Sequence, residues 1–526
     1  MDIAPHLSLS RQNDPESNIM NVQRILKRLM RDKRHEAAKR TVRLGKVRPL
    51  RIFDTFTRKK RIIKPLHNRR IGMYACGPTV YDYAHIGNFR TYVMEDVLRR
   101  LLEFNGFTVK HVMNVTDVGH LISDADTGED KILSAARKER KTAWQVADFY
   151  TKSFFQDACQ LNIEMPHIVP RATEHIPDMI NLIQRLERKG YVYVIDDGVY
   201  FDTTRVKNYG RLARSDLASL LPGARVEANP QKRNPHDFAL WKFSPKGVRR
   251  DMEWESPWGV GFIGWHTECA AMSMKYLGAH FDIHCGGEDH IPIHHTNEIA
   301  QSEAATGRKF VNYWVHAAHL IVDGKRMAKS SGNFYTLRDI VAKGYDPLSL
   351  RFFYLQGHYR RQLNFTFDAL DAAQNALNSI YEFVRRLADF PGTKHKPEIT
   401  RLTDRMKVEF VSHMNDDLDT PEALAVLFGF MTDVNKVLDA RNMSSSDAKK
   451  ALASLFDLDR ILGLKLRQTL VREELPKPVA DLIGDRERAR KAGDYTRADA
   501  IRNRLKEEFG IVLEDTPEGV KWKKRS

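Results

Sequence analysis

The chain has 526 residues, which is too long for one ordinary hydrophobic core, so we expect two to four domains. Its hydrophobic content of 42% is that of a globular protein, and no apolar run approaches the ~18 residues that a membrane span requires. No secretory signal pattern opens the sequence, and four cysteines are too few for a disulfide framework. These features predict a cytoplasmic protein with no membrane partner.

The net charge of +16 is concentrated near the N-terminus. Residues 1–70 hold 20 Lys and Arg against 6 Asp and Glu, so the rest of the chain sums to only +2. A basic segment on a near-neutral body favours a polyanionic partner, and nucleic acid is the first candidate. We interpret residues 1–48 as a basic extension. A solvated tail, a mitochondrial transit peptide and a later start at Met20 are the alternatives.

Residues 49–175 begin with the predicted order strand, strand, helix, strand. The first strand is LRIFDTFT, and the second leads into Gly72–Asn88, GMYACGPTVYDYAHIGN. We expect a buried strand that ends at Cys76, then a glycine-proline turn and a helix that starts near Phe89. This arrangement can bind anions, because the first N–H groups of a helix have no partner within the helix. A phosphate loop between a strand and a helix predicts a parallel, Rossmann-like sheet.

Two long helices are expected in this first half. The helix after Phe89 should turn its apolar residues to the core and place Arg99, Arg100 and Glu103 on the other side. The second helix should run without a break through residues 131–161. The Asp- and Gly-rich loop before it fails the EF-hand spacing, so we interpret it as a solvated loop.

The remaining segments complete the predicted architecture. Residues 176–255 have the pattern of an insertion with a helix and a hairpin, and residues 256–335 return to the pattern of a parallel sheet. Residues 336–372 and 373–475 are helical, and residues 476–526 form a helix and a small strand module. We therefore expect an α/β fold: a Rossmann-like parallel-sheet domain with an insertion, then a helical bundle and a small C-terminal α+β module.

Four residues far apart in the sequence could converge on one metal ion. His294 and Glu298 are four residues apart on a predicted helix, so their side chains share a face. Cys76 and Cys269 each lie where a strand or loop meets a helix. Two thiolates, an imidazole and a carboxylate suit Zn²⁺. Ordinary core cysteines are the alternative, since no CxxC pair is present, and His295 competes with His294.

Two segments give the chain a family resemblance. YACGPTVYDYAHIGN resembles the loop of cysteinyl-tRNA synthetases, in which HIGN corresponds to the HIGH signature of class I aminoacyl-tRNA synthetases. Arg326-Met327-Ala328-Lys329-Ser330 resembles their KMSKS loop, and Lys329 follows Asn88 by 241 residues. The resemblance extends from about Arg51 to the C-terminus and includes KRNPHDFALWK, from Lys232 to Lys242. Asn88, Ala328 and Cys285 depart from the family pattern.

The resemblance implies roles for individual residues. Cys76, Cys269, His294 and Glu298 correspond to the ligands of one zinc ion per subunit, which binds substrate cysteine as a thiolate. The amino-acid pocket would be formed by Thr116, Trp265 and Asp289, with Asp289 on the substrate ammonium; an ordinary core position is the alternative for Trp265. Asp117 shares with Thr116 the end of a strand where ligands bind, and a capping or turn role is its alternative. The catalytic and ATP-binding residues would be His85, Gly87, Asn88 and Lys329.

The activity implied is cysteine–tRNA ligation by a monomer. L-cysteine and ATP, the latter with Mg²⁺, would form cysteinyl-adenylate, and the cysteinyl group would pass to the terminal adenosine of tRNA(Cys). Residues 336–372 would contact the tRNA stem, and residues 476–526 would bind the anticodon through Asp515 and Trp522. The alternatives are a cysteine ligase of the mycothiol type, which lacks such a tail, and a non-catalytic RNA-binding paralogue.

Overall fold

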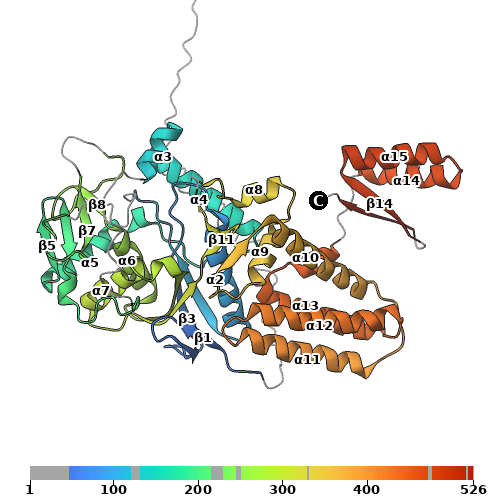
Figure 1. Ribbon diagram of the computed structural model, residues 1–526, viewed down its shortest axis with the longest axis horizontal. Coiled ribbons are helices and arrows are strands. Elements are labelled where there is room, and N and C mark those ends of the chain that lie inside the picture. Colours follow the sequence, from blue (N-terminus) through green and yellow to red (C-terminus); the bar gives the residue numbers. More distant parts are fainter. Residues whose placement is uncertain are drawn as a thin grey trace, which may run out of the picture.

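The computed structural model describes residues 47–119, 131–214, 229–244, 250–328, 331–471, 477–516 and 519–524. A four-stranded parallel sheet lies at the centre of the catalytic half (Figure 1). Its strands, in spatial order, are β10 (Val311–Ala317), β9 (Phe281–Gly287), β3 (Arg70–Ala75) and β4 (Thr108–Met113). All seven residues of β9 are buried, as expected for a parallel strand that is covered on both faces.

The strand order reverses beside β3, and the region outside the carboxyl ends of β3 and β9 is called the crevice below. The chain passes from β3 to β4 on one side, and the second half of the sheet adds β9 and β10 on the other side. Ligands of open parallel sheets bind outside the carboxyl ends of the strands where the order reverses, which here is between β3 and β9. The first predicted strand is separate: β1 (Arg51–Asp54) and β2 (Lys59–Ile62) form an antiparallel hairpin beside β10.

Helix α2 (Ile86–Phe104) follows β3 and packs against the sheet and the bundle. The expected polar side of this helix is not solvated, because Arg99 and Arg100 are both buried. The predicted helix over 131–161 is two helices, α3 (Lys131–Glu139) and α4 (Ala143–Gln160). Arg140 between them has a φ of 54°, and Thr142 caps α4, so the chain turns here. The acidic loop before α3 lies outside the described residues.

The insertion packs a helix against an antiparallel sheet. Helix α5 (Ile176–Arg188) precedes strands in the order β5 (Val192–Ile195), β6 (Gly198–Phe201), β7 (Phe238–Phe243) and β8 (Gly261–Ile263). The predicted hairpin is confirmed, since β5 and β6 pair across Asp196 and Asp197. Helices α6 (Trp265–Leu277) and α7 (His294–Thr306) then return to the central sheet on either side of β9 in the sequence.

A three-stranded sheet joins this domain to the helical part. It contains β12 (Lys325–Arg326), β11 (Leu320–Val322) and β13 (Leu363–Phe365). The helices that follow β12 are α8 (Leu337–Ala342), α9 (Pro347–Leu355), α10 (Phe367–Ala388), α11 (Pro397–Met414), α12 (Thr420–Asp439) and α13 (Ser445–Leu462). Helices α10 to α13 form the predicted bundle (Figure 1).

A small C-terminal module follows the bundle. It consists of α14 (Lys477–Lys491), α15 (Tyr495–Glu508), β14 (Ile511–Thr516) and β15 (Gly519–Lys524), and the two strands pair as an antiparallel hairpin. Its own apolar cluster includes Val479, Leu505 and Leu513. Among the described helices, none combines the length and the hydropathy that crossing a bilayer requires.

Candidate metal centre and nucleotide loops

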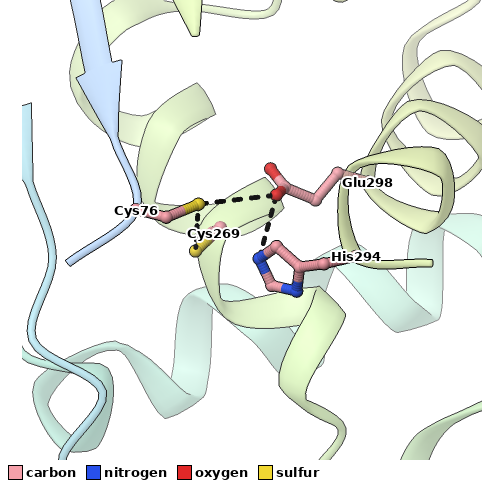
Figure 2. Close-up of side chains that lie close together, drawn as sticks. All are labelled: Cys76, Cys269, His294 and Glu298. Atoms are coloured by element: carbon pink, nitrogen blue, oxygen red, sulfur yellow. Dashed lines mark hydrogen bonds and ion pairs between the residues drawn. The ribbon is translucent and has the colours of Figure 1, made fainter. Parts of the chain in front are cut away.

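Cys76, Cys269, His294 and Glu298 lie together at the crevice beside β3, as Figure 2 shows. One candidate ligand atom from each lies within 4.8 Å of all the others, and all four side chains are buried. The two Sγ atoms are 3.8 Å apart, and His294 Nε2 is 3.1 Å from Glu298 Oε1. The four residues therefore form a donor group that could hold a metal ion.

Three different elements bring these donors together. Cys76 directly follows β3, Cys269 lies in the second turn of α6, and His294 and Glu298 occupy the first two turns of α7. The spacing of His294 and Glu298 places both side chains on one face of α7, as the sequence predicted. The sheet thus fixes one donor, and two helices that precede and follow β9 fix the other three.

The charges in the group favour an ionised carboxylate. Burial alone raises the pKa of Glu298, but the neighbouring rings of His284 and His294 outweigh burial and lower the pKa to about 2. Burial likewise raises the pKa of the Cys76 thiol, and the nearby Cys269 and Glu298 raise it further. A buried thiol beside a carboxylate is therefore costly to ionise unless a cation is present, which is the situation that a metal ion relieves.

A second donor group overlaps the first. Cys76 and Glu298 belong to both groups, and His284 and His295 replace Cys269 and His294. His284 Nε2 is 2.9 Å from Glu298 Oε2, and His295 Nε2 is 3.3 Å from Cys76 Sγ. The structure therefore brings His294 and its competitor His295 to the same place, on neighbouring positions of α7.

Several polar partners of this centre were missed by sequence reasoning. The ring of His295 pairs through Nδ1 with His316 Nε2 at 2.7 Å, and His316 Nδ1 lies 2.8 Å from Thr55 Oγ1. The signal in the sequence was a histidine inside each of two buried strands, His284 in β9 and His316 in β10. Cys285, by contrast, is buried in β9 and belongs to neither donor group.

The three residues predicted for the amino-acid pocket border the same crevice. Thr116 is buried beyond the end of β4, where its hydroxyl donates to Glu268 at 2.9 Å. The Trp265 ring lies with its centroid 4.4 Å from that of His294. Asp289 follows β9 in a short 3-10 turn, Glu288–His290, and is exposed. The Asp117 carboxylate accepts from Arg171 and Thr173, so it links the end of the β4 segment to the segment that precedes α5.

The first signature forms the N-terminus of α2. His85 is the N-cap residue: its Nδ1 accepts from the Asn88 N–H at 3.2 Å, and Asn88 Oδ1 accepts from the His85 N–H at 3.1 Å. This reciprocal capping box uses the N–H groups of His85 and Asn88, and the Ile86 N–H donates to the Tyr335 carbonyl, which leaves the Gly87 N–H of this turn for an anion. A Cβ on Gly87 would lie 2.5 Å from Met327 Cε, so the second signature packs directly against the first.

The second signature is described in part. Asn333 binds the first three residues of this loop, because its Oδ1 accepts from the Ala328 N–H at 2.9 Å and its Nδ2 donates to the Arg326 carbonyl at 3.2 Å. Lys329, the predicted phosphate ligand, lies outside the described residues. In the C-terminal module the backbone pairs Asp515 with Val520 and Trp522 with Leu513, and the positions of the Asp515 and Trp522 side chains are not described.

Comparisons with known proteins agree with this geometry. The family model "tRNA synthetases class I (C) catalytic domain" matches residues 62–375. A "DALR domain" model matches residues 409–467, and a "Cysteinyl-tRNA ligase anticodon binding domain" model matches residues 472–522. The three matches follow the order of the sheet domain, the bundle and the C-terminal module.

Relatives match over nearly the whole chain. "Cysteine--tRNA ligase 1" of Burkholderia lata is 50% identical over 473 residues, which cover 90% of this chain and 96% of the relative. "Cysteine--tRNA ligase" of Treponema denticola is 43% identical over 500 residues, which cover 90% of this chain and 99% of the relative.

A solved structure supports the fold independently. LeuRS of Agrobacterium radiobacter K84, in a ternary complex with tRNA and LeuAMS, aligns with a TM-score of 0.58 at 11% identity and covers 87% of this chain and 88% of that chain. At such low identity, this likeness concerns the fold alone. The family matches and the near full-length relatives lead to one conclusion: the chain belongs to the cysteinyl-tRNA synthetase family of class I aminoacyl-tRNA synthetases.

Proposed function

We propose how this chain carries out cysteine–tRNA ligation, the activity of its family. The carboxylate of L-cysteine attacks the α-phosphorus of ATP, which forms cysteinyl-adenylate and releases pyrophosphate. A ribose hydroxyl of the terminal adenosine of tRNA(Cys) then attacks the carbonyl carbon, and AMP leaves. No side-chain nucleophile takes part, so the protein contributes positioning and charge stabilisation.

The resident metal in this proposal is one Zn²⁺ ion, held by Cys76, Cys269, His294 and Glu298. The observation that carries the assignment is the convergence of these four buried donors at the sheet crevice. Two sulfurs in the donor set favour zinc over Mg²⁺ or Ca²⁺, which prefer oxygen ligands. When bound, zinc supplies a soft Lewis acid for a thiolate, and this separates cysteine from serine, which a hydrophobic pocket would separate poorly.

The residues around the donors would hold the rest of the substrate. Trp265 packs on His294 and would form a wall of the pocket, which keeps water from the side chain of the substrate. Asp289 is exposed at the mouth of the crevice and would accept hydrogen bonds from the substrate ammonium. Thr116, fixed by Glu268, would line the pocket from the β4 side.

The two signature loops would bind ATP with its Mg²⁺. The N-terminal turn of α2 would offer the Gly87 N–H and the positive end of the helix dipole to phosphate oxygens, and the small Gly87 would let adenine approach the backbone. His85 would contact phosphate with the ring nitrogen that does not accept from Asn88. Asn88 remains a candidate ATP contact through its amide N–H groups, and Lys329 would balance the charge on the α-phosphate as it is attacked.

Cysteine-dependent exchange of pyrophosphate into ATP tests adenylate formation directly. We expect exchange with cysteine and none above background with serine. Charging of tRNA(Cys), with an amino-sugar acceptor offered in parallel, then separates the ligase from the mycothiol-type alternative. Exchange without charging of tRNA would contradict the proposed acceptor, and the absence of exchange would favour the RNA-binding alternative.

A further inference from the structure

Both backbone groups of Ile86, the residue that begins α2, are held by residues that follow the second signature. The Ile86 N–H donates to the Tyr335 carbonyl at 2.9 Å, and the Ile86 carbonyl accepts from the Tyr354 hydroxyl at 2.6 Å. His85 also forms an isolated antiparallel bridge with Thr336. The first signature is therefore attached to the segment that leaves the second one, at the turn that faces the proposed phosphates.

Tyr354 is a rigid anchor for this attachment. It lies in the last turn of α9 and is only 4% exposed. One turn earlier in the same helix, the guanidinium of Arg351 is fully buried and donates to Asp96 in α2, to the Leu462 carbonyl at the end of α13, and to the Leu161 carbonyl after α4. Helix α9 is thus fixed to three separate elements, so the Tyr354 hydroxyl has little freedom to move.

The bond from Tyr354 acts on the geometry of the nucleotide loop. The Gly87 N–H belongs to the same planar peptide group as the Ile86 carbonyl, so the bond from Tyr354 to that carbonyl bears directly on the direction of the Gly87 N–H. The Tyr335 carbonyl binds the Ile86 N–H, and the Tyr354 hydroxyl binds the Ile86 carbonyl. The Ile86 side chain is fully buried. Without the Tyr354 hydroxyl, only the bond between the Ile86 N–H and the Tyr335 carbonyl holds this residue to the segment after the second signature. The turn can then tilt against Met327, which packs on Gly87.

We propose that Tyr354 is a positioning residue for ATP: its hydroxyl sets the orientation of the phosphate-binding turn at Ile86. The proposal rests on the proposed function, in which the His85–Asn88 turn binds the ATP phosphates. Among the hydrogen bonds and ion pairs of the described residues, none joins the Tyr354 side chain to the metal donors or to the predicted cysteine pocket. Its removal should therefore act on ATP and leave cysteine binding unchanged.

The test compares two tyrosine-to-phenylalanine variants. Tyr354→Phe removes only the hydroxyl that donates to Ile86. Tyr381→Phe is a matched control, because that buried tyrosine of α10 donates its hydroxyl to the Leu464 carbonyl at 2.9 Å, far along the chain from the loop. Each variant loses one buried hydroxyl-to-carbonyl hydrogen bond, so the two should lose similar thermal stability.

For Tyr354→Phe we expect the KM for ATP in pyrophosphate exchange to rise by roughly threefold to tenfold, the range that corresponds to one hydrogen bond. The KM for cysteine and the zinc content should stay at wild-type values. Tyr381→Phe should leave all three unchanged. Direct titration of each protein with ATP by calorimetry should give the same ratio of dissociation constants.

Two results would overturn the inference. One is an unchanged KM and dissociation constant for ATP in Tyr354→Phe. The other is an equal rise in the KM for ATP and for cysteine, which would mean that the hydroxyl only stabilises the fold. Failure of the proposed function is distinguishable, because it would abolish exchange in the wild-type protein, while the calorimetric comparison of ATP binding would still decide the role of Tyr354.

Discussion

Asn88 stands where the family resemblance leads one to expect a second histidine. Its side-chain oxygen accepts from the His85 N–H, and its own N–H donates to the His85 ring. The replacement therefore preserves the shape of the loop, since an amide oxygen can close a capping box with the N-cap residue. This contact fixes the tautomer of His85 as well, because Nδ1 must be the accepting nitrogen.

The role of the donor group can be tested at one atom. Cys269→Ser replaces a thiolate ligand with a hydroxyl, which remains protonated and is a poor zinc ligand. We expect the purified variant to lose most of its zinc on dialysis, as measured by elemental analysis per chain. Cys285→Ser is the control, because Cys285 is equally buried but lies in neither donor group, and it should keep its zinc.

Full retention of zinc by Cys269→Ser would contradict the assignment of Cys269 as a ligand. It would instead favour the second group as the metal ligands, in which His284 and His295 accompany Cys76 and Glu298. Zinc loss in both serine variants would indicate general damage to the crevice. The measurement is independent of catalysis, so it does not depend on the nucleotide loops.

At the level of single residues, the sequence predicted the four donors but not their surroundings. The i, i+4 spacing of His294 and Glu298 is a local pattern, and local patterns can be read from a sequence. His316 reaches His295 only because β10 lies beside β9, and that neighbourhood is a property of the sheet. The histidines around the donor group could therefore not be predicted from the sequence without the order of the strands in the sheet.

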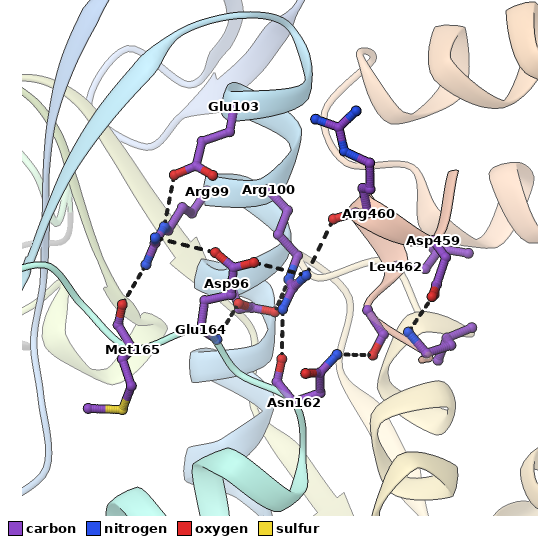
Figure 3. A network of polar contacts seen from close by, with 12 residues as sticks. Asp96, Arg99, Arg100, Glu103, Asn162, Glu164, Met165, Asp459, Arg460 and Leu462 are labelled. Carbon is purple, nitrogen blue, oxygen red and sulfur yellow. Dashed lines mark hydrogen bonds and ion pairs between the residues drawn. The ribbon is translucent and has the colours of Figure 1, made fainter. Parts of the chain in front are cut away.

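Among the elements, α2 carries the largest departure from expectation. Its charged side packs inside the molecule, where Asp96, Arg99 and Arg100 form a network with the 162–165 segment and the end of α13 (Figure 3). Arg100 donates to Asp96 at 2.7 Å, and Arg351 donates to the same carboxylate oxygen at 2.6 Å. This shared carboxylate joins the catalytic domain to α9 and the bundle.

Asp96 should therefore be important for stability. Burial raises the pKa of its carboxyl, but the charges of Arg100 and Arg351 outweigh burial and hold that pKa well below its usual range. Asp96→Asn would leave the buried Arg351 guanidinium without its ion-pair partner and Arg100 with Glu164 alone, and we expect a loss of about 3–5 kcal/mol in the free energy of unfolding. Urea unfolding followed by fluorescence measures this loss.

Asp433→Asn is a suitable control, because Asp433 pairs with Lys436 on the exposed side of α12 and should change stability by less than about 0.5 kcal/mol. The pH dependence gives a second check. Because the pKa of Asp96 is lower in the folded state than in the unfolded state, its carboxylate stabilises the fold fully above the unfolded pKa of about 4. This stabilisation is lost as the pH falls from that value through the folded-state pKa. The stability difference between wild type and Asp96→Asn should be constant from about pH 5 to 8; variation within that range would contradict the account.

Helix boundaries show why element-scale predictions were only partly correct. The apolar periodicity of residues 131–161 continues across Arg140, so it predicts one helix, but the backbone takes a positive φ there and Thr142 starts a new helix. The pattern of α2 is that of a surface helix with one polar side. The prediction that this side is exposed was wrong, because the bundle helix α13 packs on it. Periodicity identifies a face of a helix but does not reveal what packs on it.

For the whole molecule, the order of segments was predictable from the sequence and the contacts between them were not. The parallel sheet, the insertion, the bundle and the terminal module follow one another as expected. A strand was expected at the position of β1, next to the sheet strands in the sequence. In the structure β1 and β2 form a separate hairpin, and Arg51 and Lys60 in it pair with Asp416 beyond α11. Such a contact between residues more than 350 positions apart leaves no local pattern.

The positive charge near the N-terminus should strengthen the binding of tRNA(Cys). Residues 1–70 carry most of the net charge, and tRNA is a polyanion. We expect deletion of residues 1–45 to raise the KM for tRNA(Cys) at low salt, to flatten the dependence of that KM on salt, and to leave the KM for cysteine unchanged. Aminoacylation kinetics over a salt series measure this. Identical tRNA kinetics for both proteins across the series would contradict it.

The central claim is that the donor group holds a metal ion that binds the thiolate of the substrate. Cobalt substitution tests it most directly, because Co²⁺ bound to sulfur shows ligand-to-metal charge-transfer absorption in the near ultraviolet. With the protein loaded with Co²⁺, we predict that cysteine increases this absorption by adding a thiolate and that serine at the same concentration leaves it unchanged. An unchanged spectrum on saturation with cysteine would contradict the claim.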